Sequence, residues 1–485
     1  MSPHSVPGRD AHQLPGPVDL VVRNGTVVSA GSAVRADVLI ADRRVYALTE
    51  PGTAVTGRLG EIDATGRLVL PGGVDPHCHV GFTSGAFTTL DDYRQATQAA
   101  VCGGTTTIVD FAIPRPGEVP IEVATAQQAK ASQGLCDSAL HACVVEWDTS
   151  VPGQLRDLAA MGITTVKMFT TYRGETMASD QSIFKVMKEL RDIGGMVFVH
   201  CEANHIIEEQ QERSAAAGRI AARYHRETRP PVAETASVSA VIAMAEALGA
   251  PVYLVHQSSP DCLELAAAAR MRGITVFSEA VTHHLVLDDT RYDGASPERY
   301  VCCPPLRPRP MVDAMTGGLW NGVISTIGSD HCCYDTRQKA SAMHDVRTMP
   351  NGLPGVELRM PVIFSEFVHR AGLPVERFAD LCCTAPAKAN GIWPQKGELL
   401  PGSDADLVIW DPAATRSVHA ADLHMATDYS PFDGMEVTGW PATVLVRGEV
   451  VVDHGQLVDT RPRGQAVRAR PIGAHGMIAN STQNR

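Results

Sequence analysis

Apolar runs rich in β-branched residues alternate along residues 68–330 with alanine-rich segments of helical composition. This alternation predicts βα units with parallel strands, because hairpins would show period-two patterning and tight turns instead. Eight such runs can be counted, and eight parallel strands are the number that closes a (β/α)8 barrel. The runs span residues 68–77, 105–113, 138–147, 163–169, 196–200, 251–256, 274–280 and 322–330.

The two ends of the chain have a different pattern, in which short β-branched runs are joined by tight turns. This pattern is typical of antiparallel strands. We therefore predict an α/β chain, a (β/α)8 TIM-like barrel with a small discontinuous β-sandwich domain made from both chain ends. The predicted boundaries are 17–70 and 395–470 for the β-sandwich domain, 71–394 for the barrel, and 1–16 and 471–485 for disordered tails.

Composition narrows the class of protein further. The 485 residues carry a net charge of −12, which disfavours adhesion to nucleic acid or to anionic membranes. No signal peptide and no run of 18 apolar residues is visible, so we expect no membrane partner and no nucleic-acid partner. The twelve cysteines include no C-x-x-C spacing, which argues against a disulfide framework and favours a reducing cytoplasm.

Six chemically active side chains fall on, or at the carboxyl ends of, the predicted barrel strands. Those strand ends meet at one mouth of a (β/α)8 barrel, so residues spread over 250 positions would form one cluster in space. Imidazole and carboxylate groups are suitable ligands for zinc or a similar divalent ion. The residues are His77 and His79 on the first strand, Lys167 on the fourth, His200 on the fifth, His256 on the sixth and Asp330 on the eighth.

Two details of this set support a metal site. His77 and His79 are two residues apart, so in strand geometry their side chains point the same way and can hold one ion. Lys167 does not fit as it stands, because an ammonium group cannot ligate a metal and two dications would repel it. The pattern therefore predicts metal-dependent hydrolysis, with a lysine that invites chemical modification.

The chain resembles the cyclic amidohydrolases, specifically the hydantoinases and dihydropyrimidinases. The resemblance rests on GGVDPHCH, TTVKMFTTY, VHCE, VHQSS, PPLR, GSDHC and NGLPGVE, which occur in that order over nearly the whole chain. The resemblance implies that Lys167 is carboxylated and that the resulting carbamate bridges two divalent ions, which are zinc in this family. The expected reaction is opening of a hydantoin or 5,6-dihydropyrimidine ring to an N-carbamoyl amino acid by attack of metal-bound hydroxide.

The resemblance also implies a role for each residue. One ion would be held by His77, His79 and Asp330, and the other by His200 and His256, with modified Lys167 and hydroxide between them. Asp330 would take the hydroxide proton and pass it to the departing nitrogen. Tyr172 would donate a hydrogen bond to the developing oxyanion. Cys303, where relatives usually have serine, and Asn351 would recognise the ring amide chiefly through backbone groups.

Other reactive residues near the predicted site receive no role. By strand alternation Cys78, Cys201 and Cys332 should point away from the neighbouring ligands, so we expect them to serve packing. His283 and His284 follow the seventh predicted strand and could touch the barrel mouth, but the family pattern assigns no ligand there.

Three alternative functions are weighed against this one. Dihydroorotases carry an arginine two residues after the second histidine of H-x-H, where this chain has Gly81. Allantoinases generally lack a tyrosine at the position of Tyr172, although allantoin or another cyclic ureide or imide stays open as a substrate. A non-catalytic dihydropyrimidinase-like scaffold would have lost metal ligands, whereas every ligand position here is filled. The resemblance further implies a homotetramer or homodimer.

Overall fold

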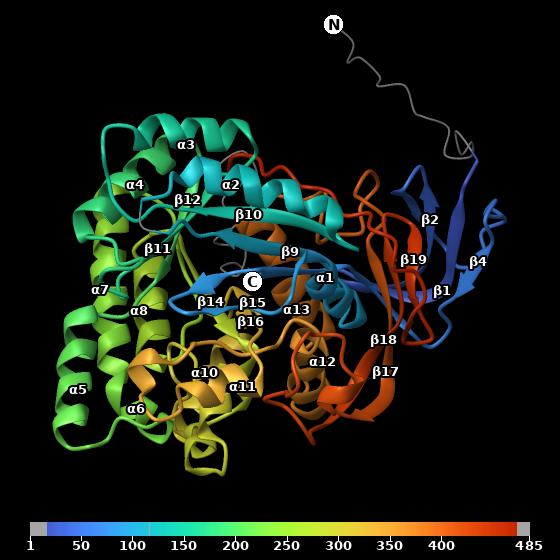
Figure 1. Cartoon of the computed structure of the whole chain (residues 1–485). Coiled ribbons are helices and arrows are strands. Elements are labelled where there is room, and N and C mark those ends of the chain that lie inside the picture. Colours follow the sequence, from blue (N-terminus) through green and yellow to red (C-terminus); the bar gives the residue numbers. More distant parts are fainter. Residues whose placement is uncertain (1–16, 116, 473–485) are drawn as a thin grey trace, which may run out of the picture.

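Parallel strands follow one another in chain order around a closed ring in the computed structural model, which describes residues 17–115 and 117–472 (Figure 1). The order in the sheet is β15-β14-β13-β12-β11-β10-β9-β6-β16, and each pair of neighbouring strands runs parallel. The predicted barrel is confirmed. Its strands are β6 (Gly73–His79), β9 (Thr105–Ala112), β10 (Asp137–Cys143), β11 (Thr165–Phe169), β12 (Met196–His200), β13 (Val252–Leu254), β14 (Val276–Val281), β15 (Thr326–Gly328) and β16 (His331–Cys332).

The eighth strand closes the ring in two pieces. β15 pairs with β14, and β16 pairs with β6 on the other side, with only two residues between the two short strands. Side chains bridge the interruption, since Ser329 Oγ donates to the carbonyl of His77 at 3.1 Å and the Ser329 amide donates to Asp75 at 3.0 Å. The sequence predicted one continuous strand over 322–330, and the break places Asp330 outside any ladder.

Helices follow the strands and form the outer layer of the barrel (Figure 1). Capping residues fix several of their ends: Asp92 and Gln95 form a capping box at the start of α1, and Gly249 ends α7 in the left-handed conformation. The helices are α1 (Tyr93–Cys102), α2 (Pro120–Ala129), α3 (Val151–Ala160), α4 (Asp180–Asp192), α5 (Asn204–Ala216), α6 (His225–Thr228), α7 (Pro231–Leu248), α8 (Pro260–Met271), α9 (Thr282–Val286), α10 (Arg309–Trp320), α11 (Thr336–Ser341), α12 (Arg359–Ile363), α13 (Val375–Ala379) and α14 (Ala385–Ala389).

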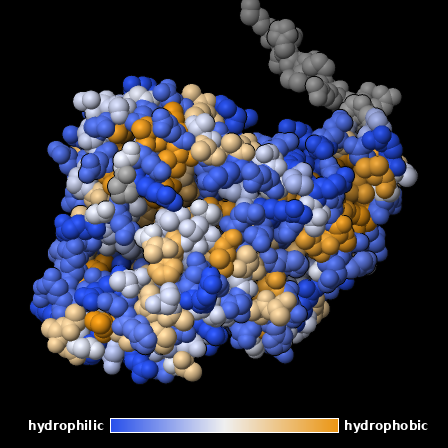
Figure 2. All heavy atoms as spheres, in the orientation of Figure 1, coloured by the Kyte–Doolittle hydropathy of each residue, from blue (hydrophilic) through white to orange (hydrophobic). Residues whose placement is uncertain are grey.

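Helix α7 is long and apolar enough to cross a membrane by length and composition alone. In the fold it packs against α8, α4 and β13 as part of the barrel's outer layer. Elsewhere the surface seen in Figure 2 is mostly hydrophilic, with apolar residues in scattered patches. The buried residues of α7, which include Val238, Val241, Ile242 and Ala245, pack into the hydrophobic core of the barrel.

Aromatic rings fill the interior of the barrel beneath its mouth. Phe111, His141, Phe198, Tyr253 and Phe277 come from β9, β10, β12, β13 and β14, and neighbouring ring centroids lie 4.5, 4.3, 3.9 and 6.1 Å apart along this row. Barrel interiors are packed cores rather than pores, and here the core is largely aromatic. These packed rings close the barrel interior below the mouth.

A second sheet joins both ends of the chain, as predicted, on the side of the barrel away from α5 and α7 (Figure 1). Its order is β20-β19-β18-β17-β5-β1-β2-β3, with β4 beside β1, so β5 and β17 connect the two parts by an antiparallel ladder. Its strands are β1 (Leu20–Val28), β2 (Ala33–Ala41), β3 (Arg44–Thr49), β4 (Glu61–Asp63), β5 (Leu68–Pro71), β17 (Leu407–Ser417), β18 (Glu436–Val446), β19 (Glu449–Asp453) and β20 (Gln456–Leu457).

After β20 the chain returns to the barrel. Amides of Gly464, Val467 and Ile472 donate to the carbonyls of Gly134, Ser138 and Gly194, at 2.8, 2.8 and 2.7 Å. These acceptors precede or begin barrel strands, so this segment lies at the end of the barrel opposite its mouth. Of the predicted tails over 1–16 and 471–485, residues 1–16 and 473–485 lie outside the described residues, and the exact domain boundaries stay predictions.

Candidate metal centre and active site

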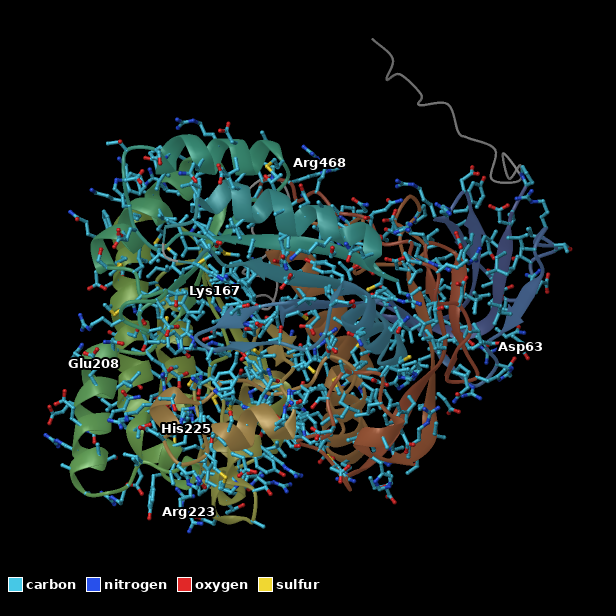
Figure 3. All side chains as sticks on the ribbon, viewed as in Figure 1. Asp63, Lys167, Glu208, Arg223, His225 and Arg468 are labelled. Carbon is cyan, nitrogen blue, oxygen red and sulfur yellow. The ribbon has the colours of Figure 1, made fainter. Side chains whose placement is uncertain are left out.

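A cavity of about 400 Å³ opens at the carboxyl ends of the barrel strands. Figure 3 shows Lys167 inside the barrel, whereas Glu208 and Arg223 lie at its outer edge. All nine residues that the sequence singled out line this one cavity, although they come from seven separate places in the chain. They are His77, His79, Lys167, Tyr172, His200, His256, Cys303, Asp330 and Asn351.

The first group of candidate ligands combines the end of β6 with the break in the eighth strand. Nε2 of His77 lies 3.1 Å from Oδ1 of Asp330, and Nε2 of His79 lies 3.3 Å from the same oxygen. One ligand atom from each of the three residues lies within 4.8 Å of the others. Contacts with His77 and His79 hold the pKa of Asp330 well below its usual range, even though burial acts in the opposite direction. Asp330 is therefore a carboxylate.

The second group pairs two histidines from neighbouring strands. Nδ1 of His200 and Nε2 of His256 face each other at 2.9 Å. Burial lowers the pKa of both residues, and it lowers the pKa of His79 to about 4. These imidazoles are therefore neutral near pH 7, which is the form that ligates a metal ion.

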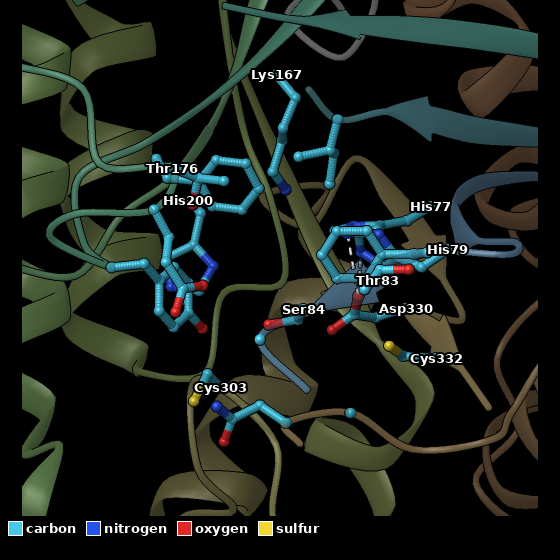
Figure 4. A pocket seen from close by; sticks show the side chains of 18 of the residues that line it. His77, His79, Thr83, Ser84, Lys167, Thr176, His200, Cys303, Asp330 and Cys332 are labelled. Atoms are coloured by element: carbon cyan, nitrogen blue, oxygen red, sulfur yellow. Dashed lines mark ion pairs between the residues drawn. The ribbon is translucent and has the colours of Figure 1, made fainter. Parts of the chain in front are cut away.

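Lys167 points into the cavity between these two groups, with His200 on one side and His77 and His79 on the other (Figure 4). Its side chain is fully buried, and Nζ has no hydrogen-bond partner among the described residues. The rings of Phe111 and Phe169 lie 4.7 and 5.1 Å from Nζ. Burial lowers the pKa of Lys167 to about 8, so about a tenth of the side chain is a neutral amine at pH 7, far more than for an exposed lysine.

Two buried glutamates that the sequence did not single out orient the histidines from behind. Oε2 of Glu279 lies 2.8 Å from Nδ1 of His77 and also accepts the His256 amide at 2.8 Å. Glu202 Oε2 lies 2.7 Å from Nε2 of His200 and 2.5 Å from Arg229. Carboxylates of this kind fix the ring orientation of metal-binding histidines. They leave Nε2 of His77 and Nδ1 of His200 directed at the cavity.

The donors present fit a pair of divalent ions. Buried atoms at this site have no hydrogen-bond partner among the described residues, including Nδ1 of His79, Nδ1 of His256 and Nζ of Lys167. Burying so many polar atoms without partners is costly unless something else binds them. Nitrogen and carboxylate oxygen are the donors that zinc prefers.

Three of the cavity residues have left-handed backbone conformations. The φ angles are 71° at Tyr172, 34° at His256 and 48° at Asp330. For residues other than glycine this region is sparsely populated and costs about 1–3 kcal/mol, and such strain collects at functional sites. Each of these residues lies just beyond a barrel strand, where the turn redirects its side chain into the cavity.

Tyr172, Cys303 and Asn351 also line the cavity. The ring of Tyr172 lies 5.4 Å from the ring of His200, and the Arg229 guanidinium lies 5.2 Å from its centroid. Sγ of Cys303 lies 4.0 Å from Nε2 of His225. Burial raises the pKa of Cys303 to about 12, so this side chain is a neutral thiol.

One prediction about cysteines is wrong. Cys332 lines the cavity (Figure 4), because it lies two residues after Asp330, and residues two apart in extended backbone point the same way. Cys78 and Cys201 are buried and absent from the cavity lining, with sulfur contacts to Ser329 and to the Val199 carbonyl. Their packing role is confirmed.

His283 and His284, which were left without a role, are buried beside the cavity but do not line it. Nε2 of His284 lies 2.9 Å from the carbonyl of Pro304, at the segment that follows Cys303. His284 therefore contacts the segment that follows Cys303, a residue of the cavity lining.

Comparison with known proteins gives one family. The amidohydrolase family matches residues 68–451. A D-hydantoinase from Ralstonia pickettii is 37% identical over 93% of this chain and 99% of that relative, and a dihydropyrimidinase from Rattus norvegicus is 36% identical over 93% and 89%. A solved D-hydantoinase (dihydropyrimidinase) from Thermus sp. has a TM-score of 0.91 and 32% identity, covering 93% of this chain and 99% of that chain. The likeness spans the barrel and the β domain together.

Proposed function

The chain belongs to the amidohydrolase family, and on this premise we propose that it hydrolyses the ring amide of a hydantoin or 5,6-dihydropyrimidine to an N-carbamoyl amino acid. Its relatives named D-hydantoinase and dihydropyrimidinase are hydrolases of cyclic amides. The observation that carries the proposal is the meeting of nine residues, chosen from sequence, around one cavity of about 400 Å³. Pockets for small ligands commonly have about 300–1,000 Å³.

We propose that two divalent ions, zinc by the chemistry of the donors, occupy the two histidine groups. His77, His79 and Asp330 would hold one ion, and His200 and His256 the other. When bound, such ions lower the pKa of a water molecule and polarise a carbonyl oxygen. Glu279 and Glu202 keep the ligand nitrogens of His77 and His200 pointed at the cavity.

Lys167 would be converted to a carbamate that bridges the two groups. Its neutral amine can attack carbon dioxide, forming a nitrogen–carbon bond and releasing one proton. The product is an anion, which removes the conflict between a buried ammonium group and two cations. The lowered pKa of Lys167, about 8, and its unpartnered Nζ support this step.

The remaining cavity residues would bind the ring and move the proton. Asp330 is ionised, reaches into the cavity and can accept a proton, then deliver it to the ring nitrogen as the amide bond breaks. The Tyr172 hydroxyl would donate to the oxyanion that develops on the carbonyl, a contact worth about 3 kcal/mol of barrier. Backbone groups of Cys303 and Asn351 would hold the ring amide.

We further propose a cytoplasmic enzyme that assembles as a homotetramer or homodimer. All twelve cysteines are free and eleven of them are buried, which suits a reducing compartment. The assembly is carried over from the family resemblance. Size-exclusion chromatography with light scattering would distinguish a monomer from either assembly.

Purified protein loaded with zinc should be assayed against hydantoin, dihydrouracil, both enantiomers of 5-substituted hydantoins, and allantoin. Appearance of the ring-opened N-carbamoyl acid, followed by chromatography, is the expected result for at least one hydantoin or dihydropyrimidine. Turnover of allantoin alone would move the substrate to another cyclic ureide. Fully loaded protein that opens none of these rings would refute the proposal.

A further inference from the structure

Lys339 is a buried cation close to the proposed active site that the proposed chemistry does not use. It lies on α11 with no exposed surface, and its Nζ donates to three backbone carbonyls: Val301 at 2.8 Å, Pro350 at 2.8 Å and Gly352 at 2.7 Å. A lysine ammonium has three donors, so all three are used. Among the described residues Lys339 forms no ion pair, and the carboxylate of Glu298 acts on it only through longer-range charge attraction.

The three acceptors belong to two segments that are distant in sequence. Val301 lies two residues before Cys303, and Pro350 and Gly352 flank Asn351. Cys303, Asn351 and Gly352 all line the cavity. The segments also meet directly, because the Gly352 amide donates to the Val301 carbonyl at 3.1 Å. One side chain therefore links the two pieces of backbone assigned to the ring amide.

Helix α11 holds this ammonium from a fixed position. Asp335 and Gln338 form a capping box at its start, and the Thr336 amide donates to Asp428 at 2.8 Å. Gln338 also donates to the carbonyl of Thr88 at 2.9 Å, in the hairpin of β7 (Thr83–Ser84) and β8 (Phe87–Thr88) that borders the cavity. The anchor is tied to both the β domain and the cavity rim.

A buried ammonium group without a counter-ion is an expensive way to stabilise a fold. Burial lowers the pKa of Lys339 to about 8, which reflects this cost. Three carbonyl oxygens that converge on one point also need three donors from one atom, which a neutral side chain of similar length does not provide. The cost is concentrated at the place where two ring-binding segments must keep a fixed separation.

We propose that Lys339 is a positioning residue that sets the separation and orientation of the Cys303 and Asn351 backbone segments for binding of the substrate ring. The inference rests on the proposed function and adds a residue that touches neither substrate nor metal. Loss of its three hydrogen bonds would let the two segments move apart. Misplacement of binding groups by about 1 Å can cost about 10²-fold in rate.

The test compares Lys339→Met and Lys339→Gln with a matched control, Arg270→Met. Arg270 is also a mostly buried cation without an acidic partner among the described residues. It donates to the carbonyls of Val276 and Gly322 at 2.7 and 3.0 Å, before or at the start of β14 and β15, the strand ends opposite the cavity. Each variant is loaded with zinc, and kcat, KM, metal content and Tm are measured with the best ring substrate.

Lys339→Met is expected to lower kcat/KM about 10²-fold, mainly through a higher KM, while it keeps the full metal content. Lys339→Gln, which retains a two-donor head group, should fall between Lys339→Met and wild type and serves alone if Lys339→Met does not fold. Arg270→Met should lower Tm yet leave kcat/KM within about twofold of wild type, because effects at separated sites are largely independent.

Unchanged kcat/KM in both Lys339 variants, with wild type active, would overturn this inference alone. So would an equal loss of kcat/KM in Arg270→Met, because lost stability would then explain the effect, or loss of metal in the Lys339 variants. Wild-type protein that opens no ring would overturn the proposed function and this inference together.

Discussion

Asp330 occupies the two-residue break between β15 and β16, where its backbone φ is 48°. Aspartate tolerates this conformation better than most residues, because its short polar side chain can bond locally. Outside the ladder, its carboxylate reaches Nε2 of both His77 and His79. The same side chain can thus serve as ligand and proton acceptor.

Asp330→Asn should abolish turnover, because an amide cannot accept the proton; removal of a general base costs about 10²–10⁴-fold. The fold should survive, since the replacement has nearly the same shape. Ring opening by the variant, measured beside Tm and metal content, checks this expectation. Retention of substantial activity would remove Asp330 from its proposed role.

Glu279→Gln should weaken metal binding about 10–100-fold, because a carboxylate that orients a ligand histidine is replaced by a neutral amide. The affinity can be measured by titration with a competing chelator. Glu246→Gln is the control: Glu246 forms an exposed ion pair with Arg272 at 3.0 Å and should bind metal as wild type does. Equal affinities in all three proteins would contradict the role of Glu279.

Residue type and position on the barrel strands were enough to place the six candidate metal ligands at the cavity, whereas Tyr172, Cys303 and Asn351 were found only through the family resemblance. Glu279 and Glu202 were missed as functional residues, although both lie close to the carboxyl ends of predicted strands. Their role depends on which histidine packs against them, and that is a property of tertiary contacts. The left-handed backbone at Tyr172, His256 and Asp330 has no sequence signal of its own, since none of them is glycine.

At the scale of elements, the sequence predicted which segments form strands but not the residues at which those strands begin and end. The eighth run was predicted over 322–330, but only Thr326–Gly328 and His331–Cys332 form ladders. Each short strand pairs with a different neighbour, and that division closes the barrel. The hydrophobic pattern of the sequence does not show that one apolar run forms two short strands with different neighbours.

The connection between β17 and β18 is docked on the barrel by a histidine–glutamate contact. His424 Nδ1 lies 2.9 Å from Oε1 of Glu357, and the His424 amide donates to Oε2 at 2.7 Å. The hydrogen bond to Glu357 raises the pKa of His424 above its ordinary value of 6.5. The charged pair therefore stabilises the fold fully below pH 6.5 and loses this contribution as pH rises through the raised pKa.

His424→Gln should consequently lower stability more at pH 6 than at pH 9. The difference should be no more than about 1 kcal/mol, because the histidine side chain is partly exposed and screened by solvent. Thermal unfolding of wild type and variant at both pH values measures it. A larger penalty at pH 9 than at pH 6 would contradict the sign of the pKa shift.

On the scale of the whole molecule, a buried cation joins the β domain to the barrel. Nζ of Lys396 lies 2.5 Å from Asp137 at the start of β10, and 3.0 and 2.7 Å from Asp404 and Asp406 just before β17. The β domain itself was predicted from its strand pattern. Its ionic junction, and the return of residues 463–472 to the barrel, could not be, because both join segments hundreds of residues apart.

Lys396→Met should destabilise the protein by about 3–5 kcal/mol, because it leaves buried carboxylates without their cation. Urea unfolding measures the change. Arg272→Met, which breaks the exposed pair with Glu246, should cost no more than about 1 kcal/mol. Similar losses in the two variants would show that the junction contributes no more than a surface ion pair.

Metal content is the measurement that tests the central claim most directly. Elemental analysis of wild-type protein purified without chelators should give two divalent ions per chain. Lys167→Ala should give fewer than one, and added short carboxylic acids should restore part of its activity by replacing the bridging carbamate. Wild-type protein that opens rings without bound metal, or a Lys167→Ala variant with two ions and full activity, would contradict a two-metal centre built on these six residues.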